Sequence, residues 1–421
     1  MVIKRTRLAN SLRLVTAPLK ETKSVTIMVL VKVGSRYEDE SNNGVSHFIE
    51  HLFFKGTKNR PSALLLSKEL DSLGAEYNAF TTKDHTGYYV KVNSEKVNIA
   101  FELVSDMLLN SLFAAPEIEK ERNVILEEIN MYEDNPLFFV EDLFEKICFK
   151  GSSLSQLISG PKKNIKKISR REILNYKNKF YNPKNIVLGL AGDITENKAL
   201  KLANRYFQST GRQGAQQKLT PFKSNQQTPR LEIKYKDTEQ VQIALGFPGY
   251  HNKDKRLMTL YLLSIILGGN MSSRLFTRIR EENSLAYFIK STINIFEDTG
   301  NFFIQAGLDR RRISTALKLI HNELEIIKSE GITDDELQRA KEFLKGKLIL
   351  KLEESQALIQ WLTEQMLLTS RIETLDDKIN KIERVTANDI KKVANEIIDF
   401  NKINLAVIGP FKDEKIFKNL I

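Results

Sequence analysis

Cysteine is almost absent from this sequence, because the 421 residues include a single one, Cys148. No disulfide can form within the chain, and the composition fits a reducing compartment, which we expect to be the cytoplasm. No apolar run reaches the length of about eighteen residues that a membrane-spanning helix needs, so a membrane is not expected as a partner. The first residues lack the continuous apolar segment and cleavage site of a signal peptide, and we expect them to form strands of the fold.

Charge of one sign is not concentrated anywhere in the chain. The 64 Lys and Arg residues outnumber the 53 Asp and Glu residues and give a net charge of +11, but acidic residues are interspersed with them almost throughout. The densest basic run, residues 160–173, is typical of a solvated helix start. A nucleic-acid partner needs a concentrated basic surface and is therefore not expected.

The two halves of the sequence resemble each other. The late segment of each half opens with a capping signal, Ser169 with Glu172 in the first and Thr386 with Asp389 in the second. Each of these segments continues as an amphipathic helix and then as an apolar strand that ends at a glycine. Earlier segments of each half read as alternating, β-branched strands. The matching pairs are 24–35 with 239–249, 85–92 with 299–308, and 168–194 with 385–411.

This duplication predicts two homologous domains, 1–208 and 230–421, joined by a linker at 209–229 that is poor in apolar residues. Strands and helices do not alternate strictly, so we expect an α+β fold. Each domain should hold a mainly antiparallel sheet with helices packed on one face. The second copy has no histidine where the first has a pair, so the chemistry of that pair belongs to the first domain.

The histidine pair lies in the segment GVSHFIEHLFFKGT, residues 44–57, which we expect to contain a helix. Asn42 or Asn43 could cap the start of this helix. Gly56 could end it, because glycine readily adopts the left-handed conformation found after helices. The helix is short and apolar apart from its two imidazoles and one carboxylate.

His47 and His51 are four residues apart and therefore share one face of the predicted helix. Two imidazoles from one helical turn suit zinc, and Glu50 lies beside that face, where it could take a proton from a zinc-bound water. A lone histidine on an apolar face would more often be a core residue. Two of five histidines around one glutamate favour a metal site instead, and the pattern HxxEH is an inverted zinc-protease signature.

A third zinc ligand is expected from the helix at 116–136. Glu121 and Glu128 interrupt an apolar stripe of this helix two turns apart, and a buried carboxylate needs a partner. Glu127 lies on a neighbouring face of the same helix. The spacing of the residues alone does not decide between Glu127 and Glu128.

The combination of GVSHFIEHLFFKGT with ERNVILEEINMYEDNP resembles the family of pitrilysin, insulin-degrading enzyme and the mitochondrial processing peptidase. The length and the duplication resemble its short bacterial members, the processing-peptidase-like zinc proteases. The resemblance implies a zinc endopeptidase with His47, His51 and Glu128 as metal ligands. It also implies that Glu50 is the catalytic base that activates a zinc-bound water, and that Glu121 supports the site from behind the ligands.

The segment at 76–92 reads as two strands joined by a turn. It resembles the family's edge strand, to which a substrate peptide adds as a further strand, and the resemblance places Asn78 and Ala79 beside the scissile bond. An ordinary hairpin is an equal alternative. We expect His85 in this segment to be structural.

The second half contains a glycine-bearing segment at 268–291 that resembles a family loop followed by an arginine and a tyrosine. Here these residues are Arg280 and Tyr287. The resemblance implies that they reach the substrate and stabilise the carbonyl oxygen as it gains charge.

Larger family members enclose a peptide with four such domains in one chain, whereas this chain has two. The resemblance therefore implies a homodimer, or a heterodimer with a related subunit, that encloses extended or unfolded peptides as substrates. The alternative is a non-catalytic partner subunit of such a peptidase, because the family includes chains that have lost the motif.

Overall fold

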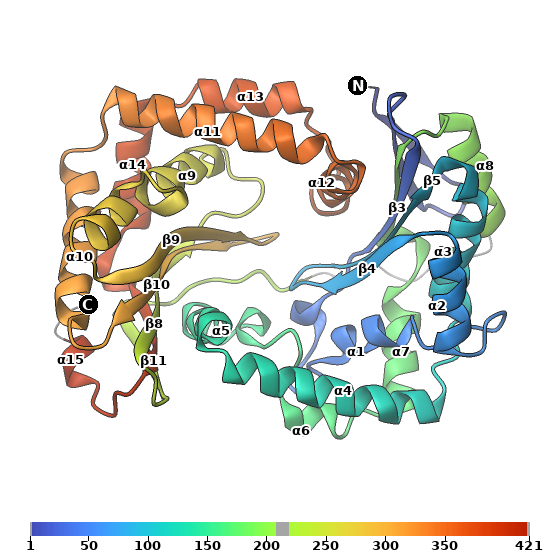
Figure 1. The fold of residues 1–421 in the computed structure, drawn as a ribbon, viewed down its shortest axis with the longest axis horizontal. Coiled ribbons are helices and arrows are strands. Elements are labelled where there is room, and N and C mark those ends of the chain that lie inside the picture. The colour runs from blue at the N-terminus through green and yellow to red at the C-terminus, as the bar shows by residue number, and fades with distance from the viewer. Residues whose placement is uncertain (1, 208–218, 419–421) are drawn as a thin grey trace. The chain divides into compact units, whose positions relative to one another are not determined.

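The computed structural model describes residues 2–207 and 219–418, and the chain forms two compact units, each built around one sheet (Figure 1). Each unit combines stretches that are not contiguous in the sequence. The stretches of the first unit are Met1–Ile129, Gln156–Thr220 and Leu350–Glu373, and those of the second are Asn130–Ser155, Pro221–Ile349 and Thr374–Ile421.

The sheet of the first unit has six strands in the order β1-β2-β6-β3-β5-β4. Only β2 and β6 run parallel, and all other neighbours are antiparallel. Within the described part of the chain β4 pairs only with β5, so its other backbone edge is open there. The strands are β1 (Lys4–Arg7), β2 (Arg13–Pro18), β3 (Ser24–Val31), β4 (Glu76–Thr81), β5 (Thr86–Asn93) and β6 (Ile186–Gly192).

The sheet of the second unit repeats this pattern with five strands in the order β7-β11-β8-β10-β9. β7 and β11 run parallel, and the remaining neighbours are antiparallel. The expectation of an α+β fold with mainly antiparallel sheets is confirmed. The strands are β7 (Arg230–Tyr235), β8 (Gln240–Gly249), β9 (Ala286–Ile295), β10 (Gly300–Asp309) and β11 (Asn404–Gly409).

The helices of the two halves also correspond, since α7 before β6 and α14 before β11 both begin with a capping box, as predicted. No helix in the described ranges is long and apolar enough to cross a membrane. The helices of the first half of the sequence are α1 (Val45–Leu52), α2 (Ala63–Ser72), α3 (Val97–Asn110), α4 (Ala115–Asp134), α5 (Pro136–Cys148), α6 (Lys162–Ile165), α7 (Arg170–Phe180) and α8 (Glu196–Phe207). Those of the second half are α9 (Leu257–Ser264), α10 (Ile313–Ser329), α11 (Asp334–Leu352), α12 (Ser355–Leu368), α13 (Leu375–Glu383), α14 (Ala387–Ile397) and α15 (Lys415–Lys418).

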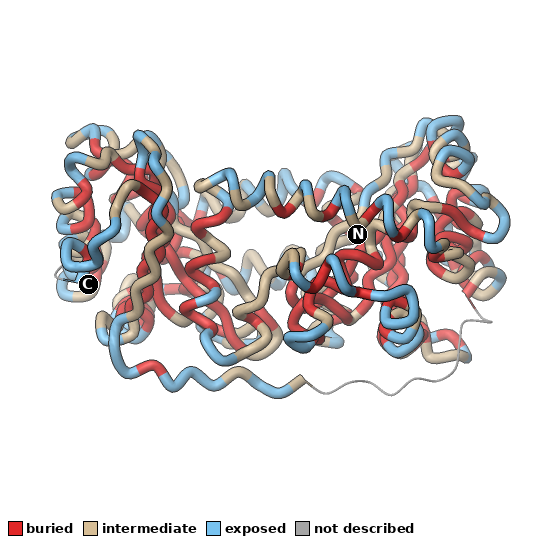
Figure 2. The backbone as a smooth tube through the Cα atoms, turned by 90° about the horizontal axis from the view of Figure 1, so that it is seen from below, coloured by how far each residue is buried: buried red, intermediate tan, exposed pale blue. Residues whose placement is uncertain are grey.

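Both faces of the first sheet are covered, because β6 is buried at every residue and β3 at all but its first; buried residues are red in Figure 2. Alternate residues of β3 join the core formed with α1, α3, α7 and α8. The opposite face carries α12, which packs so closely that a Cβ added at Gly189 would lie 2.3 Å from the side chain of Thr363. The predicted helical layer on one face is therefore accompanied by one helix on the other face, because β3 and β6 are apolar on both sides.

The second sheet is covered in the same way by α5. Phe139 and Phe144 of α5 form a separate core cluster with Phe303 of β10. The predicted division keeps α5 within 1–208 and α12 within 230–421, whereas each of these helices packs on the sheet built mainly from the other half. Of the predicted linker, residues 209–218 lie outside the described residues, and residues 219–229 form no helix or strand.

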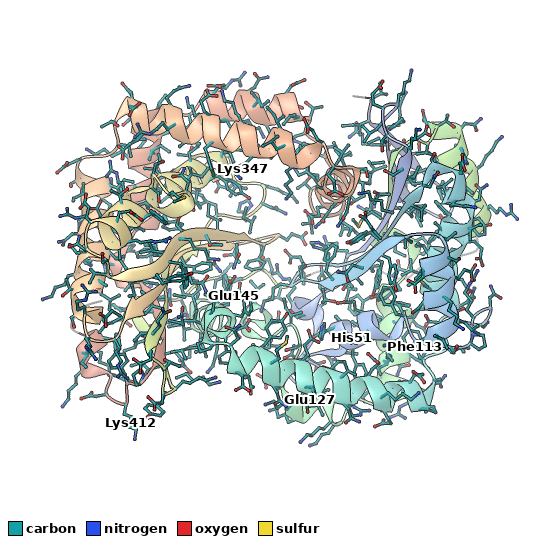
Figure 3. All side chains as sticks on the ribbon, in the orientation of Figure 1. His51, Phe113, Glu127, Glu145, Lys347 and Lys412 are labelled. Carbon is teal, nitrogen blue, oxygen red and sulfur yellow. The ribbon has the colours of Figure 1, made fainter. Side chains whose placement is uncertain are left out.

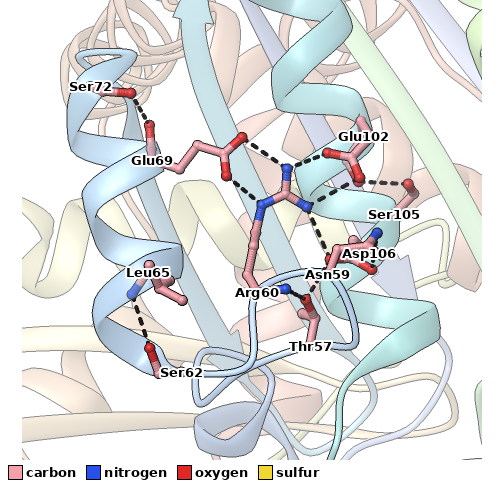
Figure 4. Close-up of polar contacts among 10 residues, drawn as sticks. All are labelled: Thr57, Asn59, Arg60, Ser62, Leu65, Glu69, Ser72, Glu102, Ser105 and Asp106. Carbon is pink, nitrogen blue, oxygen red and sulfur yellow. Dashed lines mark hydrogen bonds and ion pairs between the residues drawn. The ribbon is translucent and has the colours of Figure 1, made fainter.

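The loop after α1 is fastened by the guanidinium group of Arg60 (Figure 4). Arg60 binds Glu69 of α2 at 2.5 Å, and Glu102 and Asp106 of α3 at 2.6 and 3.0 Å. Thr57 donates its hydroxyl to Asp106 and accepts the backbone N–H of Arg60. This network holds the C-terminal end of the histidine segment against two helices of the first unit.

Candidate metal centre

The helix α1 begins differently from the prediction. Its N-cap is Gly44, at φ +104°, and neither Asn42 nor Asn43 caps it with a side chain. The buried carboxylate of Glu38 replaces such a cap, because it accepts the N–H groups of Gly44 and Ser46, each at 2.7 Å. Asn43 instead donates its side-chain amide to Glu38 at 2.8 Å. The predicted asparagine cap is therefore wrong, and Glu38, six positions before the N-cap, orients the first turn of the helix.

His47, His51 and Glu128 form the one group of potential metal ligands found among the described residues. The Nε2 atoms of the two histidines are 3.3 Å apart. The Oε2 atom of Glu128 lies 3.6 Å from Nε2 of His47 and 3.4 Å from Nε2 of His51. A tetrahedral zinc ion with ligands at about 2.0–2.2 Å separates its donor atoms by about 3.3–3.6 Å. The three donors therefore fit three corners of a zinc site.

Glu121 supports the second histidine from the far side of its ring. Its Oε2 lies 3.1 Å from Nδ1 of His51, and its Oε1 lies 2.8 Å from Nζ of Lys55. The carboxylate is buried, with 5% of its residue surface exposed. A proton on Nδ1 directs the lone pair of Nε2 toward the metal position, which is the usual arrangement of a histidine ligand.

Glu127 and Glu128 occupy different sides of α4. Glu128 is half-buried and contacts both histidines of α1, whereas Glu127 is exposed. Figure 3 labels Glu127 on α4 and His51 on the neighbouring α1. The geometry therefore brings Glu128 to the histidines, which the spacing of the residues could not decide.

The charges around the pair favour a bound cation. Burial and the neighbouring His51 lower the pKa of His47 below its usual range. Burial also disfavours the charged form of His51, but its contacts with Glu121 and Glu128 and the charge of Glu50 raise its pKa to about 9. Three carboxylates thus surround two imidazoles, and a divalent cation fits this excess of negative charge.

Glu50 lies beside the ligand group without joining it. Its Oε2 accepts the hydroxyl hydrogen of Thr81, at the end of β4, at 2.6 Å. Burial raises the pKa of this carboxyl, while the bond from Thr81 and the nearby His51 act in the opposite direction. Glu50 is therefore a half-buried carboxylate near His51, and its role as a catalytic base stays a prediction.

The predicted hairpin is the antiparallel pair β4 and β5, with β4 at the edge of the sheet. Asn78 is exposed on β4, and its Oδ1 accepts the N–H of Ala79 at 2.8 Å. Ala79 packs against the core. His85 is buried in the turn, where its Nδ1 lies 3.2 Å from the hydroxyl of Thr82, and it is not part of the ligand group.

Arg280 and Tyr287 lie together within the second unit. The guanidinium carbon of Arg280 is 5.9 Å from the ring centre of Tyr287 and 4.7 Å from that of Phe276. Tyr287 is 73% exposed. Their role at a substrate carbonyl stays a prediction.

Sequence reasoning missed three residues that support the site: Glu38, Lys55 and Thr81. Lys55 follows His51 by four residues, a spacing that puts two side chains on one face of a helix. This spacing could have suggested that both contact the same carboxylate, which is that of Glu121. Glu38 and Thr81 come from a loop and a strand end, and no periodicity connects either of them with α1. Only the folded chain brings these two to the site.

Comparison with known proteins finds two family models that match successive parts of the chain. Residues 13–162 match the family model described as Insulinase (Peptidase family M16), and residues 167–344 match that of the Peptidase M16 inactive domain. An uncharacterized zinc protease of Streptomyces coelicolor is 36% identical over 418 residues, which cover 98% of this chain and 91% of that protein. The chain belongs to peptidase family M16. The predicted resemblance is thereby confirmed.

Two further proteins match the chain over nearly their whole length. The uncharacterized zinc protease YmxG of Bacillus subtilis is 35% identical, with 97% of this chain and 98% of that protein covered. The crystal structure of a protease from Helicobacter pylori superposes with a TM-score of 0.91 at 24% identity, covering 97% of this chain and 99% of that one. The two-domain M16 fold therefore extends over essentially the whole chain.

Proposed function

We propose that this M16 protein is a zinc endopeptidase that cleaves extended or unfolded peptides. Zinc as cofactor and peptide hydrolysis as activity agree with the names of its relatives, which are zinc proteases. The observation that carries the proposal is the geometry of three donor atoms, from His47, His51 and Glu128, with the carboxylate of Glu50 beside them. A complete set of ligands argues against the alternative of a non-catalytic partner subunit.

Zinc bound by these three side chains supplies the acidity that lets water act as a nucleophile near neutral pH, together with a positive charge beside the scissile carbonyl. Glu50 is the catalytic base and accepts one proton of the attacking water. The carboxylic acid that forms can return this proton to the amine nitrogen as the peptide bond breaks. Glu121 holds His51 in the tautomer that a ligand needs, and Lys55 holds Glu121.

The substrate is expected to lie along β4, whose outer edge is open. An extended peptide would add there as a further antiparallel or parallel strand, and main-chain hydrogen bonds of this kind accept many sequences. Asn78 and Ala79 would contact the peptide near the scissile bond. The hydrogen bond from the N–H of Ala79 to Oδ1 of Asn78 would break when this N–H donates to the substrate instead.

Arg280 and Tyr287 are proposed to bind the carbonyl oxygen from the second unit. Two copies of the chain, or this chain with a related subunit, would then enclose the peptide and exclude folded proteins. A cytoplasmic location, which the single cysteine suggested, belongs to the same proposal.

The activity is tested with the purified protein and a fluorogenic peptide library. Hydrolysis should stop when zinc is removed by a chelator and return when one equivalent of zinc is added. Hydrolysis that is unchanged in metal-free protein would contradict the proposal.

The assembly is tested by mixing two inactive variants, Glu50→Gln and Arg280→Ala. If the arginine acts across a dimer, mixed dimers contain one complete site and activity returns. If it acts within one chain, the mixture stays inactive. An active monomer in sedimentation that also digests folded proteins would contradict the enclosed site.

A further inference from the structure

The hydroxyl of Thr81 makes a direct hydrogen bond with the carboxylate of Glu50. Its Oγ1 donates to Oε2 of Glu50 at 2.6 Å, which is the short distance of a bond to a charged acceptor. The bond joins the end of β4 to the middle of α1 (Val45–Leu52). It occupies one carboxylate oxygen at this position and leaves Oε1 for another partner.

The strand geometry aims this hydroxyl at α1. Alternate residues of a strand point to the same face, so Thr81 shares a face with Ala79 and Tyr77. These two pack against the core of the first unit, and the ring of Tyr77 stacks on Phe54 after α1 with 6.0 Å between centres. Threonine is branched at Cβ, which restricts its side-chain rotamers and fixes where the hydroxyl points.

The turn that follows Thr81 is fixed within the sheet. Thr82 donates its N–H to the carbonyl of His85 at 2.8 Å, and its hydroxyl accepts the N–H of His85 at 3.0 Å. Asp84 in the same turn forms a buried ion pair with Arg36 at 2.8 Å, in which the side chains are 4% and 2% exposed.

The backbone of the preceding loop holds this turn as well. The N–H of Ser35 donates to the carbonyl of Thr82 at 3.1 Å. Gly34 approaches so closely that a Cβ there would lie 2.1 Å from the same carbonyl oxygen. Thr81 is therefore attached to a rigid part of the first unit.

A glutamate side chain has several rotatable bonds, and a base must lie within hydrogen-bond reach of the proton that it accepts. Fixing Oε2 on a rigid strand end restricts where Oε1 can lie. The same strand, β4, carries the open edge that is proposed to receive the peptide. Thr81 can thus fix the position of the Glu50 carboxylate relative to a peptide bound along β4.

We propose that Thr81 is a positioning residue, which orients the Glu50 carboxylate for proton transfer and couples it to the edge strand β4. This inference rests on the proposed role of Glu50 as the base. Thr81 itself is expected to contact neither the metal nor the reacting atoms.

The test compares Thr81→Val, which is nearly isosteric but has no hydroxyl, with Thr81→Ser, which keeps the hydroxyl. Thr81→Val should lower kcat by about 10- to 100-fold, the range expected for a hydrogen bond to a charged group. KM should stay within about twofold of that of the wild type, because binding of the substrate is not affected. Thr81→Ser should restore most of kcat, and all three proteins should bind zinc with equal affinity.

A double-mutant cycle with Glu50→Gln separates positioning from a structural role. If Thr81 acts through Glu50, adding Thr81→Val to Glu50→Gln should change the residual single-turnover rate by a factor of about one. An equal loss in both backgrounds, or a rise in KM with unchanged kcat, would overturn the inference. So would normal kcat in Thr81→Val while Glu50→Gln is inactive.

Two further outcomes are distinguished by the same set of proteins. Full activity in Glu50→Gln would contradict the proposed function itself rather than the role of Thr81. Should Thr81→Val not fold, as judged by thermal unfolding, Thr81→Ala removes the same hydroxyl without placing a methyl group against the carboxylate and gives the same comparison.

Discussion

Replacing Glu128 with Gln should release zinc, whereas the same change at its neighbour Glu127 should not. A carboxylate oxygen of Glu128 lies 3.6 and 3.4 Å from the two histidine nitrogens, which makes it the third donor of the proposed zinc site. Glu127 is exposed on the same helix, and each change removes one negative charge. The two variants are therefore matched in chemistry and sequence position and differ in what the carboxylate contacts.

The expected size of the effect follows from these contacts. Loss of a residue that hydrogen-bonds to a metal ligand typically lowers metal affinity by about 10- to 100-fold. Loss of a charged ligand itself should lower the zinc affinity of Glu128→Gln further, on the order of a thousandfold, or about 4 kcal/mol. For Glu127→Gln, the charge is screened by water and salt, and the affinity should change by less than about threefold. Competition with a fluorescent zinc chelator measures both affinities. Zinc retained by Glu128→Gln but lost by Glu127→Gln would show that the assignment is wrong.

Three other substitutions test the supporting structure. Arg60→Met should lower the free energy of unfolding in urea by about 3 kcal/mol, because it leaves the carboxylate of Asp106 buried without its cation; a change under about 0.5 kcal/mol would contradict this. Gly189→Val should destabilise the first unit by about 1–3 kcal/mol, since its side chain would meet α12, and an unchanged unfolding midpoint would argue against that packing. Lys55→Met should weaken zinc binding by about 10- to 100-fold through Glu121, and Lys55→Arg should not; equal affinity in both would exclude a role for this cation.

The sequence predicted the parts of the site that depend on local spacing. His47 and His51 share a face because four residues make about one helical turn, and Glu121 and Glu128 interrupt one stripe for the same reason. The strands and capping boxes of the duplicated halves were also predictable, because alternation and capping act over a few residues. These features need no knowledge of how distant segments pack.

The remaining features depend on packing between distant segments. Glu38 orients the first turn of α1 from a loop, and Thr81 reaches Glu50 from a strand 31 residues away in the sequence. The packing of α12 on the first sheet was not predicted either, although the continuous apolar run 27–31 within β3 indicates a strand that is buried on both faces. The choice of Glu128 over Glu127 needed either the family resemblance or the folded helix.

The proposed role of Glu50 as the catalytic base is tested most directly by measuring zinc content and peptide hydrolysis on the same sample of Glu50→Gln. Gln is nearly the same shape as Glu but cannot accept the proton, while His47, His51 and Glu128 remain as the proposed ligands. We expect one zinc per chain, as in the wild type, and a loss of turnover of about 10²- to 10⁴-fold. Near-normal turnover with zinc bound would contradict the assignment of Glu50 as the base, and loss of zinc from this variant would contradict its place beside the ligands.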